Sequence, residues 1–223
     1  AAGDSDIYYS PADWAWAVGL LDSLLAVWPY GVPVVAYRTS SRFDPEKTLY
    51  VMQKYRVSVG IYPSTALKGF RELKNPRDKF DLCLRCLVSG GEPVSGDLVN
   101  WMRQVLQTDF NQAYGQTEAN YFIGNCTALE TAPVEPLGKA YPGHNVAIVD
   151  EKGQKVATGE EGDIGLHRQN PVVMKEYWKN PDATREKFAG EWLLTGDRAT
   201  MDENGYIYFR GRQDDIIKSS GYR

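Results

Sequence analysis

The 223-residue sequence has few of the features that indicate secretion, membrane insertion or nucleic-acid binding. Its three cysteines are sparse and odd in number, so we expect a cytoplasmic protein, or one of the mitochondrial matrix in a eukaryote. No run approaches the roughly 18 apolar residues of a membrane helix. The N-terminal AAGDSD has no signal-peptide core. A net charge of −4 argues against a nucleic-acid-coating surface but leaves local anion sites open.

The sequence also has few histidines and cysteines that could form a catalytic or metal site. His144 and His167 are the only histidines, neither belongs to a recognisable triad, and we expect both to be structural. Cys83 and Cys86 form a C-x-x-C within an apolar run, FDLCLRCLVSGG. No second ligand pair accompanies them, so a structural strand is favoured, with a metal or redox site as the alternative.

The first half of the chain alternates strand-like and helix-like segments. Apolar and β-branched runs predict strands at residues 6–10, 32–37 and 57–62 and within 82–93 and 108–118. Helical periodicity predicts helices at 14–28, 44–55, 64–73 and 95–106, the second with Asp44 as N-cap and Pro45 in first position. This alternation predicts an α/β fold with a mostly parallel sheet and flanking helices. Ligands gather beyond the carboxyl ends of such strands.

The second half of the chain is predicted to form a small antiparallel β-subdomain. Strand-like runs are separated by the turn sequences EKG, GEEGD and DENG, and prolines mark the change of character around residues 133–142. We therefore expect an α/β part at 1–132, a β-rich subdomain at 133–210 and a hinge at 211–223.

Two glycine turns follow predicted strands. In VSGGEPV, Gly90 and Gly91 would let the backbone approach a ligand and Glu92 could accept from an amine, although a tight structural turn is the better interpretation. In AYGQTEANYF, Thr117 can donate to a phosphate oxygen and Glu118 can hold Mg²⁺. A helix start beyond this turn would add N–H groups for an anion, and a simple capping pair is an equal alternative.

Two further stretches lie near the C-terminal end. In TGDRA, predicted as a turn between strands, Asp197 could take both hydroxyls of a ribose, although Gly-Asp turns are common. In the closing stretch, Arg212 and Arg223 offer cationic forks for phosphate or ribose oxygens, and a solvated charged loop is the ordinary alternative.

Taken in order, SGGEPV, YGQTE and TGDRATMDENGYIYFRGRQDDIIKSSGYR resemble the adenylate-forming superfamily of acyl-CoA synthetases, non-ribosomal adenylation domains and luciferases. SSGYR and EYWKNPDATREKFAGEWLLTGD look most like the medium-chain acyl-CoA synthetases. The resemblance covers nearly the whole chain. It implies part of the superfamily's large N-terminal domain and, with ATP, Mg²⁺ and CoA, conversion of a fatty or other carboxylic acid to acyl-AMP and then acyl-CoA.

The resemblance also implies residue roles. The ATP or AMP site would comprise Gly91, Glu92, Pro93, Gln112, Ala113, Tyr114, Gly115, Gln116, Thr117, Asp197 and Arg212. Within it, Tyr114 would stack on the adenine, Asp197 would hold the ribose diol and Arg212 would add a second ribose contact. Thr117 and Glu118 would be catalytic, through phosphate and Mg²⁺. Asp215 would be the hinge, and CoA would contact Ser220, Gly221, Tyr222 and Arg223.

An acyl pocket is implied by DWAWAVG, with Trp16, Ala17 and Val18 near the acyl chain. Acetate-specific relatives have a tryptophan where this chain has Gly115, and Gly90 replaces a valine. The resemblance therefore implies a deeper pocket and an acid longer or broader than acetate.

Two elements of the superfamily have no counterpart here: the phosphate loop upstream and the C-terminal domain with its adenylation lysine. We expect a central piece of a longer enzyme that cannot complete adenylation alone. The alternatives are a module that binds nucleotide or acyl-adenylate without turnover, and an adenylation domain that loads a carrier protein.

Overall fold

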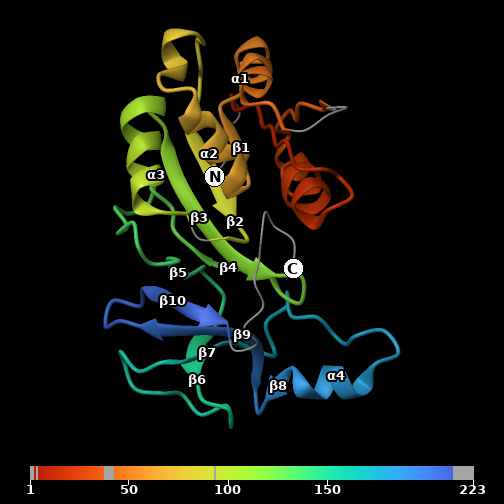
Figure 1. The fold of residues 1–223 in the computed structure, drawn as a ribbon. Helices are drawn as coiled ribbons and strands as arrows, with labels where there is room; N and C mark the ends of the chain where they lie inside the picture. The colour runs from red at the N-terminus through yellow and green to blue at the C-terminus, as the bar shows by residue number, and fades with distance from the viewer. Residues whose placement is uncertain (1–2, 4, 38–42, 93, 213–223) are drawn as a thin grey trace. The chain divides into compact units, whose positions relative to one another are not determined.

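The computed structural model describes residues 3, 5–37, 43–92 and 94–212. The chain forms two compact units, Ala1–Gln112 and Ala113–Arg223 (Figure 1). The α/β class predicted from the sequence is confirmed, and the predicted boundary near residue 133 stays a prediction. Among the helices of the described ranges, none has the length and apolar character to cross a bilayer.

The first unit is built on a parallel strand pair with a helical crossover. β1 (Val59–Ile61) pairs with β2 (Cys86–Gly90), and α2 (Ser64–Glu72) lies between them in the sequence. α1 (Pro45–Lys54) precedes the pair. α3 (Gly96–Trp101) continues as the π-helix η4 (Met102–Leu106) and leads to β3 (Asp109–Gln116), which begins beside β2. Figure 1 shows α1, α2 and α3 around these strands.

α1 begins where the sequence predicts. The Asp44 carboxylate accepts a hydrogen bond from the Lys47 N–H at 3.0 Å, and Pro45 holds the first helical position. Leu49 and Met52, one turn apart, are both fully buried. Capping and a buried apolar face therefore act together at this helix.

The two segments predicted as strands before α1 form only isolated bridges. Tyr8 bridges Val34 and Val59, both in parallel. The Tyr8 N–H donates to the Pro33 carbonyl, and the Val35 N–H donates to the Tyr8 carbonyl, each at 2.8 Å. Because Pro33 has no N–H, the ladder cannot continue through it. The strand predictions for residues 6–10 and 32–37 are therefore wrong in extent.

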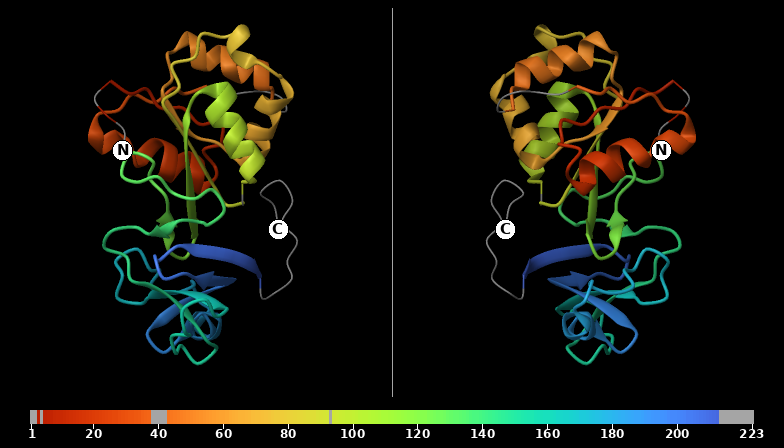
Figure 2. Two further views of the ribbon diagram at one scale, coloured as in Figure 1. Left: turned by 90° about the vertical axis from the view of Figure 1, so that its left-hand side faces the viewer. Right: turned by 90° about the vertical axis from the view of Figure 1, so that its right-hand side faces the viewer.

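The second unit contains an antiparallel sheet of order β10-β9-β7-β6, with β8 beside β9, which confirms the β-rich character predicted for this half. Its elements are β6 (Val146–Val149), β7 (Gly162–His167), α4 (Pro181–Glu186), β8 (Phe188–Ala189), β9 (Trp192–Met201) and β10 (Ile207–Arg212). The predicted DENG turn is confirmed, because the Asp202 carboxylate accepts from the N–H groups of Asn204 and Tyr206 at 2.9 Å each. Figure 2 gives two further views of these strands.

The chain after β3 returns as a strand. The second part of β3 pairs antiparallel with β4 (Asn120–Gly124), which pairs with β5 (Lys139–Ala140). Phe122 and Ile123 are fully buried in the core of this unit, and aromatic and β-branched residues favour strands. The helix start predicted beyond YGQTE, with its N–H groups for an anion, is therefore wrong.

Candidate functional site

Three of the predicted nucleotide residues meet in the second unit. Asp197 on β9 accepts a hydrogen bond from the Tyr114 hydroxyl at 2.6 Å through Oδ2. Its Oδ1 accepts from Nη1 of Arg212 on β10 at 3.0 Å, and both partners of this ion pair are largely buried. The two contacts fix the plane of the carboxylate. Because each carboxylate oxygen has two lone-pair sites, Asp197 retains capacity for further donors.

A bulge in β9 places Asp197 at this point. Asp163 of β7 is opposite Arg198, whereas Gly165 is opposite Leu194, so three residues of β9 face one of β7. Gly196, inside the bulge, has φ +77°, a conformation that other residues adopt only with strain. TGDRA was predicted as a turn between two strands, and that is wrong, because it is a bulge within one strand. Bulges of this kind commonly aim a side chain out of the ladder.

Tyr114 is a partly buried hydrogen-bond donor that packs against the core of the second unit. Burial and the neighbouring Asp197 carboxylate raise its pKa well above the ordinary value, so its hydroxyl keeps the proton that it donates. The ring packs edge-on against Phe122, with centroids 5.5 Å apart. The predicted stacking of this ring on adenine stays a prediction.

Glu118, the predicted Mg²⁺ residue, lies in the turn between β3 and β4. Its Oε1 accepts from the Tyr177 hydroxyl at 2.5 Å, and its carbonyl accepts from the Met174 N–H at 2.7 Å. Thr117, beside it, is exposed. In the described ranges no three His, Cys, Asp or Glu side chains are grouped to hold a metal. Mg²⁺ is usually held by one or two carboxylates together with phosphate oxygens, so Glu118 fits such an ion only with a nucleotide present.

The first unit contains the glycine turn after β2. Gly91 has φ +85°, which is the backbone conformation of a turn glycine and supports the structural interpretation of this segment. The Glu92 carboxylate accepts from the Ser64 hydroxyl at 2.6 Å, which ties the turn to the start of α2. Pro93 lies outside the described residues. The roles predicted for Gly91 and Glu92 toward adenine stay predictions.

Gly115 has a local reason to be glycine. The β3–β4 register shifts between Tyr114 and Gly115, and the backbone of Asn120 lies against Gly115. A Cβ added there would be 1.8 Å from the Asn120 carbonyl oxygen. A side chain at this position would therefore require the β3–β4 backbone to shift.

The other predicted residues lie in three places. Gln112 and Ala113 are buried in β3, and the Gln116 amide donates to the Thr195 carbonyl at 3.4 Å. Trp16, Ala17 and Val18 lead into the π-helix η1 (Val18–Leu25), which is shorter than the helix predicted at 14–28, and Trp16 is 52% exposed. The hinge residue Asp215 and the CoA segment, Ser220 to Arg223, lie outside the described residues. The acyl pocket, including Gly90, stays a prediction.

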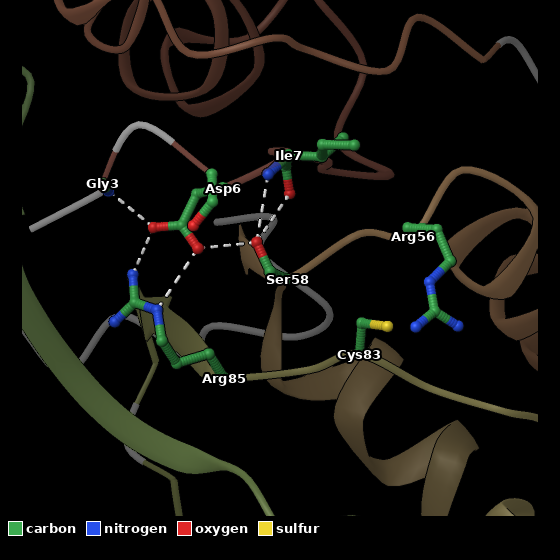
Figure 3. A pocket seen from close by; sticks show the side chains of 8 residues that line it. Gly3, Asp6, Ile7, Arg56, Ser58, Cys83 and Arg85 are labelled. Carbon is green, nitrogen blue, oxygen red and sulfur yellow. Dashed lines mark hydrogen bonds and ion pairs between the residues drawn. The ribbon is translucent and has the colours of Figure 1, made fainter.

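A pocket in the first unit contains none of the predicted site residues. Figure 3 shows Asp6, Ser58 and Arg85 at its centre. Arg85 donates to both carboxylate oxygens of Asp6, from Nε at 3.2 Å and from Nη2 at 2.5 Å, and the Ser58 hydroxyl donates at 2.7 Å. Nearby, Cys86 is buried at the start of β2, in agreement with the strand interpretation of the C-x-x-C segment.

Asp6 should stabilise the fold in a pH-dependent way. Burial acts to raise its pKa, but the hydrogen bonds from Arg85, Gly3 and Ser58 lower it to about 2, from 3.8. The stabilisation is thus complete above pH 3.8 and is lost as the pH falls through about 2. Its size is about 1–2 kcal/mol, since Arg85 is half exposed and partly screened. Urea unfolding from about pH 5 to about pH 2 should show wild type losing that much more stability than Asp6→Asn. Parallel curves would contradict this.

Two contacts around the candidate site were not predicted from the sequence. The buried Asp163, on the neighbouring strand β7, accepts from the β9 bulge, and Tyr177 reaches Glu118 from a segment 59 residues away. A carboxylate within a short and mostly apolar strand, GDIGLH, was the available signal for Asp163. No local pattern marks Tyr177.

Residues 1–178 match the AMP-binding enzyme family, and the chain belongs to that family. An uncharacterised acyl-CoA ligase of Bacillus subtilis and a mitochondrial acyl-coenzyme A synthetase of Mus musculus are each 34% identical over 222 residues. Both alignments cover 98% of the chain but only 41% and 38% of these relatives. The predicted resemblance to adenylate-forming enzymes is confirmed.

A solved structure is similar throughout. An anthranilate CoA ligase in complex with anthranoyl-AMP is 28% identical, with a TM-score of 0.86, and covers 98% of the chain. The chain spans 42% of that protein. The chain therefore has a fold found in adenylate-forming ligases and spans about two fifths of the proteins it matches.

Proposed function

We propose that the chain supplies part of the nucleotide site of a ligase that activates a carboxylic acid with ATP and transfers the acyl group to CoA. The observation that carries this proposal is Asp197, a buried carboxylate on a bulge whose oxygens are oriented by Tyr114 and Arg212. A carboxylate held in this way can accept from both hydroxyls of a ribose. Membership of the AMP-binding enzyme family supports a nucleotide as its ligand.

The proposed reaction has two steps. A carboxylate oxygen attacks the α-phosphorus of ATP, the bond to the bridging oxygen breaks, and acyl-AMP and pyrophosphate form. The CoA sulfur then attacks the acyl carbon, the bond to the AMP oxygen breaks, and the thiol proton is released. The first step joins two anions, so it depends on charge neutralisation and in-line placement and requires no nucleophilic side chain.

We assign the residues accordingly. Asp197 binds the ribose, with Arg212 beside it, and Thr117 donates to a phosphate. Glu118 would help to hold Mg²⁺ when a nucleotide is bound. The metal would neutralise phosphate charge, and the Tyr177 hydroxyl would orient the Glu118 carboxylate.

The proposed substrate is an acid larger than acetate. The anthranoyl-AMP bound by one structural relative supports a pocket for a broad acid. Gly90 and Gly115, which leave two positions of the proposed pocket without side chains, also support it. A substrate-length series with a longer protein that contains this segment tests the proposal, and a clear preference for acetate would contradict it.

Pyrophosphate exchange tests the activity directly. A longer protein that contains this segment should exchange labelled pyrophosphate into ATP only when a carboxylic acid is added. The 223 residues alone should not approach that rate. AMP binding without exchange in the longer protein would instead favour a binding module without turnover. Transfer to a carrier-protein thiol in place of CoA would favour a carrier-loading domain.

A further inference from the structure

The β9 bulge that presents Asp197 is held by one buried carboxylate of the neighbouring strand β7. Asp163 on β7 accepts through Oδ1 from the Thr195 N–H at 2.8 Å and from the Thr195 hydroxyl at 3.2 Å. The Gly196 N–H donates to both of its oxygens, at 3.2 and 3.0 Å. The bulge interrupts the β7–β9 ladder, and Asp163 gives these two N–H groups an acceptor.

The connection continues to Asp197 through one hydroxyl. The Thr195 Oγ1 donates to Asp163 and accepts from the Asp197 N–H at 3.1 Å. Asp163, Thr195 and Asp197 are all buried, so water does not compete for these bonds. The backbone of Asp197 is therefore connected to Asp163 through the Thr195 hydroxyl. Its side chain is hydrogen-bonded to Tyr114 and Arg212.

Fold stability alone is a poor reason for a carboxylate at this position. Asp163 is 4% exposed, and in the described ranges no ion pair includes it. Burial raises its pKa, and the hydrogen bonds from Gly196 and Thr195, with the charge of Lys187, only partly oppose this effect. A buried charge without a close cation usually costs stability. The two oxygens of one carboxylate can, however, accept from two successive N–H groups of the bulge, those of Thr195 and Gly196.

We propose that Asp163 is a positioning residue, which acts through Thr195 to hold Asp197 in the orientation that binds a ribose. The proposal rests on the proposed function, because it takes Asp197 as the ribose-binding group. Asp163 itself would touch neither ligand nor reacting atoms. Its effect should therefore be confined to ligands that carry the ribose hydroxyls.

The test compares AMP with 2′,3′-dideoxy-AMP, which lacks both hydroxyls, in calorimetric titrations of the 223-residue chain. Asp163→Asn and Thr195→Val should each weaken AMP binding about tenfold, the effect of one misplaced hydrogen bond, and leave dideoxy-AMP affinity unchanged. Thr195→Ser keeps the hydroxyl and should bind AMP like wild type. Asp150→Asn is the matched control, because Asp150 also accepts backbone N–H bonds, in a turn of the same unit.

The outcomes distinguish failure of the positioning role of Asp163 from failure of the ribose-binding role of Asp197. Equal weakening for both ligands, or unchanged AMP affinity in Asp163→Asn and Thr195→Val, would overturn the positioning role while leaving Asp197 as the ribose residue. A wild-type chain that binds AMP and dideoxy-AMP equally would overturn the ribose assignment itself. If Asp163→Asn fails to fold, the contrast between Thr195→Val and Thr195→Ser decides, because both keep Asp163.

Discussion

Replacing Asp197 with asparagine is expected to lower the affinity for AMP about a hundredfold, because two charge-assisted hydrogen bonds to the ribose are worth about 1.5 kcal/mol each. The same change should destabilise the second unit by about 3 kcal/mol, since the buried Arg212 guanidinium loses this carboxylate. Titration calorimetry measures the affinity, and chemical unfolding measures the stability.

Two controls separate binding from folding in this experiment. Asp202→Asn changes an aspartate of the β9–β10 turn and should bind AMP like wild type. The double variant Asp197→Asn with Arg212→Met removes the buried cation and should recover part of the lost stability without recovering affinity. An Asp197→Asn protein that binds AMP as tightly as wild type would refute the role of this residue.

Gly115→Ala is expected to cost about 3 kcal/mol of folding free energy, because the added Cβ would lie 1.8 Å from the Asn120 carbonyl oxygen and the β3–β4 backbone must move. Gly115→Trp should be at least as destabilising. Gly3→Ala is the matched control, since its Cβ would meet only an Asp6 oxygen at 3.7 Å and should change stability by less than about 0.5 kcal/mol. A Gly115→Ala protein as stable as wild type would show that this position of β3 tolerates a side chain.

This second prediction concerns a residue that the sequence assigned to the acyl pocket. The glycine before QTE was interpreted as space for a larger acid, because related enzymes for acetate have tryptophan at that position. In the structure, a register shift between β3 and β4 brings backbone against Gly115. The contact with Asn120 was not predictable from the sequence, and the role of Gly115 in the acyl pocket stays a prediction.

Elements with local determinants were predictable from the sequence. Asp44 and Pro45 mark the start of α1, and DENG marks the β9–β10 turn, because the relevant hydrogen bonds join residues two to four positions apart. The strand expected at residues 32–37 is only a single bridge in the structure. Pairing there depends on Tyr8, which is distant in the sequence, and is limited by Pro33, which has no N–H group. Pairing partners distant in the sequence were the source of error.

The residues of the candidate site likewise differ in whether a local sequence pattern predicts them. Asp197 is marked by its own motif, TGD, and by the family resemblance. Asp163 lies 32 residues from Thr195, and the β7–β9 register alone brings them together. Tyr177 reaches Glu118 from 59 residues away. Such supporting contacts are set by strand register and loop path, which a single sequence does not encode in any short pattern.

A crystal structure of the chain with AMP would test the central claim most directly. The account predicts that both ribose hydroxyls donate to the Asp197 carboxylate, at about 2.7 Å, with the bulge of β9 unchanged. A nucleotide bound with its ribose hydroxyls on other groups, and Asp197 still engaged only by Tyr114 and Arg212, would contradict it.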